Sequence, residues 1–153
     1  MKKLLKGAFL ALMSVVMFAA CSDDDEYQET TLDVTPHNIA GSWRLESWSG
    51  EELAEGNYVY IDIVRNDRTY TLYQNIDSPQ LRVITGRYFI ETDPEFGAII
   101  RGNYDYGNGE WAHRYIVTDL TAERMVWTAK DNSEDVSVYV RAELPEGFKP
   151  EEE

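Results

Sequence analysis

The feature that most constrains this chain is a series of short β-type runs, each ended by turn residues. The runs cover residues 42–49, 57–64, 69–75, 81–91, 96–104, 111–118, 124–130 and 135–143. They are rich in aromatic and β-branched residues, and pairs such as Asn-Asp, Asp-Pro and Asn-Gly separate them. Eight consecutive strands with hairpin-length connections favour an all-β, antiparallel up-and-down barrel, because closure of the sheet leaves no unpaired edge.

The N-terminus has the features of a targeting signal. Three lysines precede an apolar run at residues 8–18, followed by two alanines and Cys21, the single cysteine. The run is too short to span a bilayer, which needs about 20 apolar residues. We therefore predict that residues 1–20 are a secretory signal peptide. One cysteine also excludes an intrachain disulfide.

The residues Phe-Ala-Ala-Cys at 18–21 resemble the lipobox of bacterial lipoproteins. This resemblance implies that Cys21 is lipidated, with fatty acyl chains such as palmitate, and two or more chains hold a protein stably at a membrane. The acidic residues 22–26 resemble tags that send some lipoproteins of Gram-negative bacteria to the cell surface. The expected location is the surface of the outer membrane, with a periplasm-facing position as the alternative.

The composition divides the remaining chain into three parts. Residues 21–35 are polar and acidic without periodicity, which predicts an extended lipidated tether. Residues 36–143 hold the predicted barrel, and the acidic, proline-punctuated residues 144–153 predict a disordered tail. The formal net charge of −14 disfavours nucleic acid as a partner, because phosphates would be repelled.

Several motifs of the barrel resemble lipocalins. Gly41-Ser42-Trp43 resembles the Gly-x-Trp signature, residues 66–70 and 85–88 resemble hairpin and strand motifs of small bacterial lipocalin-like lipoproteins, and residues 139–141 resemble the closing strand. The resemblance implies a calycin-type barrel in which Arg141 packs over Trp43. Such a barrel-closing cation–π pair is worth about 0.5–2 kcal/mol. An eight-stranded barrel has room for packed side chains or for one small ligand.

The sequence carries no recognisable catalytic or metal-binding motif. His37 and His113 lack partners at metal-ligand spacing, and neither HExxH, CxxC, Gly-x-Ser-x-Gly nor a Walker motif occurs. The oxygen-rich residues 131–135 lack the spacing of a calcium loop and are more typical of a hairpin turn. We therefore expect a protein that is not an enzyme and that uses no cofactor and no metal.

Aromatic residues are the remaining candidates for a site. The candidates for a ligand-binding interior are Trp43, Tyr60, Tyr88, Tyr115 and Trp127, although aromatic residues in strands also serve simply to fill a core. The sequence therefore predicts non-covalent binding of a small apolar or amphipathic molecule inside the barrel or at its mouth.

A second interpretation places the function on a loop. The segment NYDYGNGEW offers Tyr104, Tyr106 and Trp111 as a surface contact for protein or glycan. The alternative function is therefore a surface interaction module with a filled barrel interior.

Overall fold

A computed structural model describes residues 30–105 and 107–148 of the chain. In order, the elements there are α2 (Pro36–Ile39), β1 (Gly41–Trp48), β2 (Glu51–Glu52), β3 (Val59–Val64), β4 (Thr69–Gln74), β5 (Arg82–Asp93), β6 (Gly97–Tyr104), β7 (Gly109–Glu110), β8 (Tyr115–Thr118), β9 (Arg124–Ala129), β10 (Asn132–Arg141) and the 3₁₀ helix η1 (Glu146–Phe148). The predicted signal peptide, Cys21, Tyr106 and residues 149–153 lie outside this description. None of the helices within it is long and apolar enough to cross a membrane.

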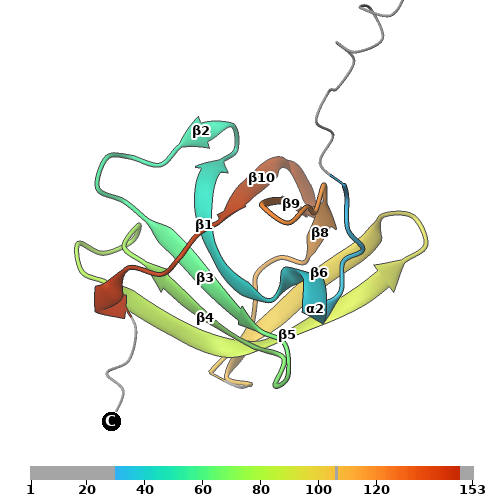
Figure 1. Ribbon diagram of the computed structural model, residues 1–153, viewed down its shortest axis with the longest axis horizontal. Coiled ribbons are helices and arrows are strands. Elements are labelled where there is room, and N and C mark those ends of the chain that lie inside the picture. Colours follow the sequence, from blue (N-terminus) through green and yellow to red (C-terminus); the bar gives the residue numbers. More distant parts are fainter. Residues whose placement is uncertain (1–29, 106, 149–153) are drawn as a thin grey trace, which may run out of the picture. The chain divides into compact units, whose positions relative to one another are not determined.

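The longer strands form one closed antiparallel barrel (Figure 1). Strands β1, β3, β4, β5, β6, β8, β9 and β10 each pair with the next one along the chain, and β10 returns to pair with β1. In that closing register Trp43 lies opposite Arg141 and Trp48 opposite Ser137. The two-residue strands β2 and β7 extend the hairpins beside β1 and β6. The predicted eight-stranded up-and-down barrel is confirmed.

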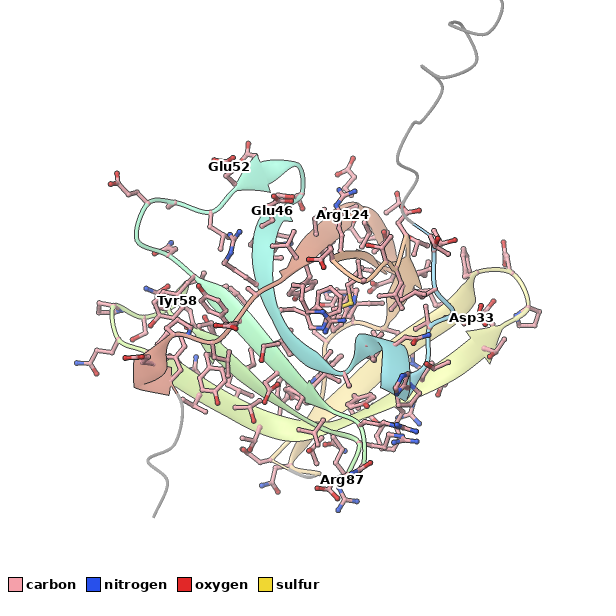
Figure 2. The ribbon with its side chains drawn as sticks, viewed as in Figure 1. Asp33, Glu46, Glu52, Tyr58, Arg87 and Arg124 are labelled. Atoms are coloured by element: carbon pink, nitrogen blue, oxygen red, sulfur yellow. The ribbon has the colours of Figure 1, made fainter. Side chains whose placement is uncertain are left out.

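Alternation of side chains along the strands separates a core from an outer face. On β3, Val59, Ile61 and Ile63 are buried, whereas Tyr60 and Asp62 between them are not. Successive side chains of a strand point to opposite faces of the sheet, so apolar residues of one phase line the interior. Glu46, Glu52 and Arg87 are exposed and point away from the barrel (Figure 2).

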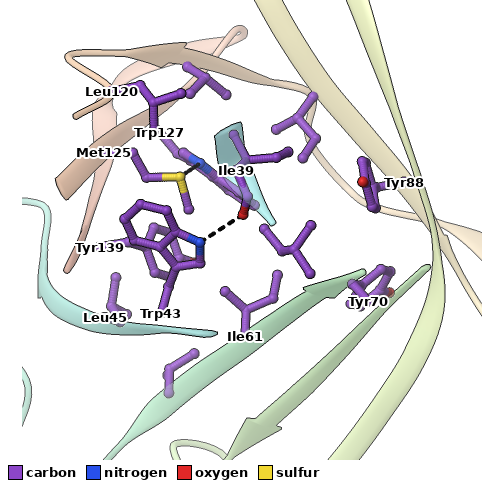
Figure 3. Close-up of a cluster of buried hydrophobic side chains, with 14 residues drawn as sticks. Ile39, Trp43, Leu45, Ile61, Tyr70, Tyr88, Leu120, Met125, Trp127 and Tyr139 are labelled. Atoms are coloured by element: carbon purple, nitrogen blue, oxygen red, sulfur yellow. Dashed lines mark hydrogen bonds between the residues drawn. The ribbon is translucent and has the colours of Figure 1, made fainter. Parts of the chain in front are cut away.

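The barrel interior holds one continuous apolar cluster (Figure 3). Its buried members are Ile39, Trp43, Leu45, Val59, Ile61, Ile63, Tyr70, Tyr88, Ile100, Val117, Leu120, Met125, Trp127 and Tyr139. Full burial of a large apolar side chain contributes about 1.5–3 kcal/mol relative to exposure. This cluster therefore supplies the main favourable term in the stability of the fold.

Helix α2 and Arg141 close the barrel at the start of β1. Thr35 caps the helix by accepting a hydrogen bond from the backbone N–H of Asn38 at 3.1 Å. The Trp43 indole N–H donates to the Ile39 carbonyl at 2.9 Å, and the Arg141 guanidinium carbon lies 3.7 Å from the centre of the Trp43 ring. The predicted pair of Trp43 and Arg141 is therefore present as a cation–π contact.

Gly41 makes room for this closure. A Cβ atom at Gly41 would lie 2.7 Å from Nη1 of Arg141, and the residue has a φ of +113°. That backbone conformation is open to glycine and strained for other residues. The first residue of the Gly-x-Trp motif therefore allows the guanidinium to cross the chain and reach the indole.

The predicted range of the barrel, residues 36–143, is too short at both ends. Leu32 and Val34, assigned to the tether, pack against the core, and the backbone N–H of Leu32 donates to the Leu120 carbonyl at 2.7 Å. At the other end Phe148, assigned to the disordered tail, stacks on Tyr73 with ring centres 5.4 Å apart. Apolar residues in these otherwise polar segments pack against the barrel. The ordered unit therefore extends beyond residues 36–143 in both directions.

Candidate ligand pocket

A pocket of about 140 Å³ lies among the interior side chains. Its lining residues are Ile61, Tyr70, Leu72, Tyr104, Trp111, Ala112, Tyr115, Trp127, Ser137 and Tyr139. Along β10 the chain reaches Ser137, then Tyr139, then Arg141, and Ser137 pairs with the last residue of β1. The pocket therefore lies on the side of the core away from α2 and the Trp43–Arg141 contact.

Aromatic rings in mutual contact form most of the pocket wall. The Trp127 ring centre lies 4.9 Å from that of Tyr139, 5.5 Å from that of Tyr115 and 6.1 Å from that of Trp111. Tyr70 meets Trp111 edge to face at 5.1 Å. Such tilted and edge-to-face pairs stabilise each other beyond the area they bury. The aromatic rings of the wall therefore hold one another in position without requiring a ligand.

Trp111 reaches the pocket from the connection between β6 and β8. Its backbone N–H donates to the Gly102 carbonyl at 2.9 Å, and its indole N–H donates to the Tyr70 hydroxyl at 2.8 Å. Tyr70 in turn donates to the Asn103 carbonyl at 2.8 Å. A Cβ atom at Gly102 would lie 2.4 Å from Cε2 of Trp111, so the ring packs directly on the glycine backbone. Trp111 is thus fixed inward at three points.

Four hydroxyl groups of the pocket wall have no hydrogen-bond partner among the described residues. They belong to Tyr104, Tyr115, Ser137 and Tyr139, whereas the Tyr70 hydroxyl is engaged by Trp111 and Asn103. Within the same residues no enclosed side-chain nitrogen or oxygen lacks a partner. The four unpaired hydroxyls are therefore not fully enclosed, so a bound molecule or water can reach them.

The hydroxyls of the pocket stay protonated at neutral pH. Burial raises the pKa of Tyr115 to about 12, with smaller contributions from the negative charges of Asp135 and Asp131. Burial likewise raises the pKa of Tyr70 to about 12, against the opposing effect of the hydrogen bond from Trp111. The pKa of Tyr139 is raised in the same direction, chiefly by burial. Tyr115 and Tyr139 therefore act as neutral hydrogen-bond donors or acceptors.

No charged side chain of the described residues lines the pocket. In this part of the chain there is also no group of three or more His, Cys, Asp or Glu residues placed to hold a metal ion. The pocket can therefore offer apolar contact, aromatic faces and hydroxyl hydrogen bonds to a bound molecule. Its residues do not form the nucleophile-and-base arrangement that covalent catalysis needs.

The predicted interior residues divide into three groups. Tyr115 and Trp127 line the pocket, whereas Trp43 and Tyr88 are fully buried in the core away from it. The prediction of an interior Tyr60 is wrong: its side chain lies on the outer face, with its ring centre 5.8 Å from that of Phe148. The phase of β3 is set by its isoleucines and valine, which leaves Tyr60 on the outside.

The structure separates the residues of the predicted surface contact. Trp111 packs inward and lines the pocket, whereas Tyr104 lines the pocket and is also 37% exposed, so its surface role stays a prediction. Tyr106 lies outside the described residues. Trp111 turns inward because Gly102 leaves room for its ring and Tyr70 accepts its indole N–H.

Six of the ten residues of the pocket wall were not predicted from the sequence. The missed residues are Ile61, Tyr70, Leu72, Ala112, Ser137 and Tyr139. A signal for Tyr139 was available, because it precedes Arg141 by two residues and shares its face of β10. Ile61 was predictable in a similar way. The charged Asp62 belongs on the outer face of β3, and alternation along the strand then places Ile61 on the interior face.

Comparison with known proteins gives one match. Residues 39–127, more than half of the chain, match the family described as the lipocalin-like domain. No curated protein and no solved structure gives a significant match. The matched range begins at the end of α2, includes Trp43 and ends at Trp127 in the pocket wall.

Proposed function

The chain belongs to the lipocalin-like domain family, and from this premise we propose that it binds a small apolar or amphipathic molecule non-covalently in the pocket beside Trp127. A lipocalin-like barrel fits a ligand-binding role in general. The pocket beside Trp127 offers space for a small molecule among the interior side chains. Its aromatic wall favours apolar contact, and its hydroxyls favour at least one polar group on the molecule.

The unpaired hydroxyls carry this proposal. Among the described residues every enclosed polar side-chain atom is paired, whereas the hydroxyls of Tyr104, Tyr115, Ser137 and Tyr139 belong to one pocket wall and have no partner. A polar group removed from water is costly unless it forms a hydrogen bond. For stability alone, phenylalanine in place of tyrosine and alanine in place of serine would avoid the cost of these unpaired hydroxyls. Retained hydroxyls are useful where something enters and binds them.

The volume limits the size of the bound group. A pocket of about 140 Å³ is smaller than the roughly 300–1,000 Å³ of sites that hold drug-sized molecules. It is close to the cavity of about 150 Å³ that holds one benzene molecule in an engineered protein core. We therefore propose that the barrel encloses a single ring or a branched head group. A long acyl chain would not fit inside.

Tryptophan resonances can test this assignment. The chain has four tryptophans, and Trp111 and Trp127 line the pocket whereas Trp43 and Trp48 do not. Titration with benzyl alcohol, which carries one ring and one hydroxyl, should shift the indole N–H signals of Trp111 and Trp127 in ¹H–¹⁵N NMR spectra. The signals of Trp43 and Trp48 should stay in place. Saturable shifts at the latter pair alone would place binding elsewhere.

A blocked pocket supplies the matched control. Ser137→Leu adds apolar volume inside the wall, and filling a cavity commonly preserves or raises stability by about 0.5–2 kcal/mol. The variant should therefore remain folded and lose the benzyl alcohol shifts. Ser133→Leu, an exposed position on the same strand, should keep them. Unchanged binding by Ser137→Leu would contradict the pocket as the site.

The alternative function has one observation in its favour and one against it. Most of the barrel interior is filled by the core cluster, as an interaction module would require. However, Trp111, one of the aromatic residues predicted to form the contact surface, packs inward, and Tyr104 is exposed but also lines the pocket. Binding within the pocket therefore accounts for more of the structure than contact with protein or glycan.

We propose further that the protein is a lipoprotein anchored through Cys21. The support is the lipobox-like sequence and the acidic residues that follow it. Cys21→Ala should release the protein from the membrane fraction of cells, because acyl chains that bury many methylenes would be lost. Protease treatment of intact cells distinguishes a surface location on the outer membrane from a periplasm-facing one. Continued detergent dependence of Cys21→Ala would contradict the anchor.

A further inference from the structure

We propose that the pocket selects a methylated ammonium head group, such as that of a small quaternary amine, and holds it among the rings of Trp111, Tyr115, Trp127 and Tyr139. This inference rests on the proposed function, since it names the class of molecule that the same pocket takes. It depends on the composition of the wall, the charges around it and the volume inside it.

The wall offers the right chemistry for a diffuse positive charge. Aromatic rings carry negative potential on their faces, and indole attracts cations more strongly than phenol or benzene. Two indoles and two phenols are joined here through ring-centre distances of 4.9–6.3 Å. Cages of several aromatic rings are the usual way in which proteins recognise quaternary ammonium groups.

The charges near the pocket are negative. Asp135 and Asp131 act electrostatically on Tyr115, and Asp105 acts on Tyr70, in each case as a smaller contribution than burial to a raised pKa. None of these carboxylates lines the pocket itself. Asp135 accepts a hydrogen bond from the Trp48 indole at 2.8 Å, which holds its charge in place. The field at the pocket thus favours a cation and disfavours an anion.

The nearby cations are engaged with other carboxylates. The Lys130 ammonium lies 3.4 Å from Asp93, and the Arg114 guanidinium lies 3.4 Å from Glu91. His113 contacts the carboxylate of Asp131 at 2.8 Å and meets Tyr115 edge to face. No lysine or arginine of the described residues therefore occupies the aromatic wall in place of a ligand.

The wall favours a methylated over a primary ammonium group. A primary ammonium carries three N–H donors that need acceptors once water is removed. The pocket has no carboxylate and only a few hydroxyl oxygens with which to meet them. A methylated ammonium has no such requirement, and its methyl groups make apolar contact with rings and with Ile61 and Leu72. The hydroxyls of Ser137 and Tyr139 remain available to a polar substituent beside the charge.

A pair of molecules with the same shape and different charge tests the inference. Choline and 3,3-dimethylbutan-1-ol differ in having nitrogen or carbon at the branched centre, so both fit a small pocket equally well. Isothermal titration calorimetry should give a dissociation constant at least tenfold lower for choline. Methylammonium should bind more weakly than choline, because its donors find too few acceptors. Both signals of Trp111 and Trp127 should shift with choline in NMR spectra.

Two variants separate the aromatic and the electrostatic contributions. Trp111→Leu should weaken choline at least tenfold and weaken the neutral alcohol less, whereas Phe89→Leu, on the outer face, should change neither. Asp135→Asn should weaken choline by roughly two- to fivefold at low salt and leave the alcohol unaffected. Glu55→Gln, in the loop before β3 and not in the pocket wall, is its matched control.

The outcomes distinguish the two proposals. If the neutral alcohol binds as tightly as choline with shifts at Trp111 and Trp127, the cation preference is wrong and the small-molecule pocket stands. If choline binds more tightly but shifts neither indole, the site is misplaced and this inference is overturned. If neither compound binds at any accessible concentration, the inference is contradicted, and the proposed function falls with it only if benzyl alcohol also shifts neither indole.

Discussion

The two ends of the barrel interior use the same kinds of residue for different purposes. At the end near α2, Trp43 donates to Ile39, and the Arg141 guanidinium donates to the carbonyls of Asn38, Ala40 and Ala122. At the other end, Tyr115, Ser137 and Tyr139 leave hydroxyls unpaired around an open pocket. Polar groups that are hydrogen-bonded within the protein stabilise the fold. Unpaired polar groups around a pocket remain available to a ligand.

The contrast shows why aromatic content alone does not locate a site. Trp43 and Tyr88 are as large and as aromatic as Trp127 and Tyr115, yet only the second pair faces empty volume. The Tyr88 hydroxyl donates to the Val64 carbonyl at 3.1 Å, so its one O–H donor is already used. The pairing state of the polar atoms, together with the volume, identifies the end that can bind.

The largest effect is expected from removing the indole at the closed end. Trp43→Ala deletes a fully buried side chain and its contact with Arg141, so it should lower the free energy of unfolding by about 3–5 kcal/mol. Trp48→Ala, at a side chain that is 50% exposed, should cost less than about 1 kcal/mol. Urea denaturation followed by circular dichroism measures both. Equal losses would show that the closed end is not the stabilising end.

An intermediate loss of stability is expected from a substitution at Gly102, on which the Trp111 ring packs. Gly102→Ala places a Cβ atom 2.4 Å from the Trp111 ring and 2.8 Å from the Arg87 carbonyl, and overpacking of this kind costs about 1–3 kcal/mol. The displaced ring should also change the Trp111 indole signal and weaken benzyl alcohol. Gly147→Ala, where no atom lies within 4 Å of the new Cβ, should alter neither property. An unchanged Trp111 signal in Gly102→Ala would argue against the packed position of this ring.

The smallest effect is a dependence on alkaline pH. The pKa of Tyr115 is raised by burial to about 12, so the folded state keeps its proton longer than the unfolded chain does. The resulting stability is fully present below the ordinary pKa of about 10 and is lost as pH rises through about 12. Tyr115→Phe should therefore show a shallower fall in melting temperature between pH 9 and pH 11, with Tyr58→Phe on the outer face as control. Identical profiles would show that this phenol is not shielded from water.

The fold was predictable because its pattern is local and repeated. Short alternating strands and hairpin turns fix an antiparallel meander, and the Gly-x-Trp motif with a distant arginine fixes how β1 and β10 meet. The phase of β3 was equally readable, since Asp62 belongs outside and Tyr60 shares its face. That error came from weighing aromatic character above alternation.

The pocket was less predictable because it depends on contacts between distant segments. Whether Trp111 points outward or inward is decided by Gly102 and by the hydroxyl of Tyr70, which lies 41 positions away in the chain. Neither residue is distinctive by itself in the sequence. The position of Phe148 on Tyr73 has the same origin, because a single aromatic residue in a polar tail gives no periodic signal.

Only one end of the barrel interior is expected to accept a ligand. A crystal structure of the protein soaked in benzyl alcohol measures this directly. The predicted result is density for one ring bounded by Trp111, Trp127 and Tyr139, with its hydroxyl near Ser137 and no probe beside Trp43. Density at the Trp43–Arg141 end, or only ordered water in a pocket exposed to saturating probe, would contradict the account.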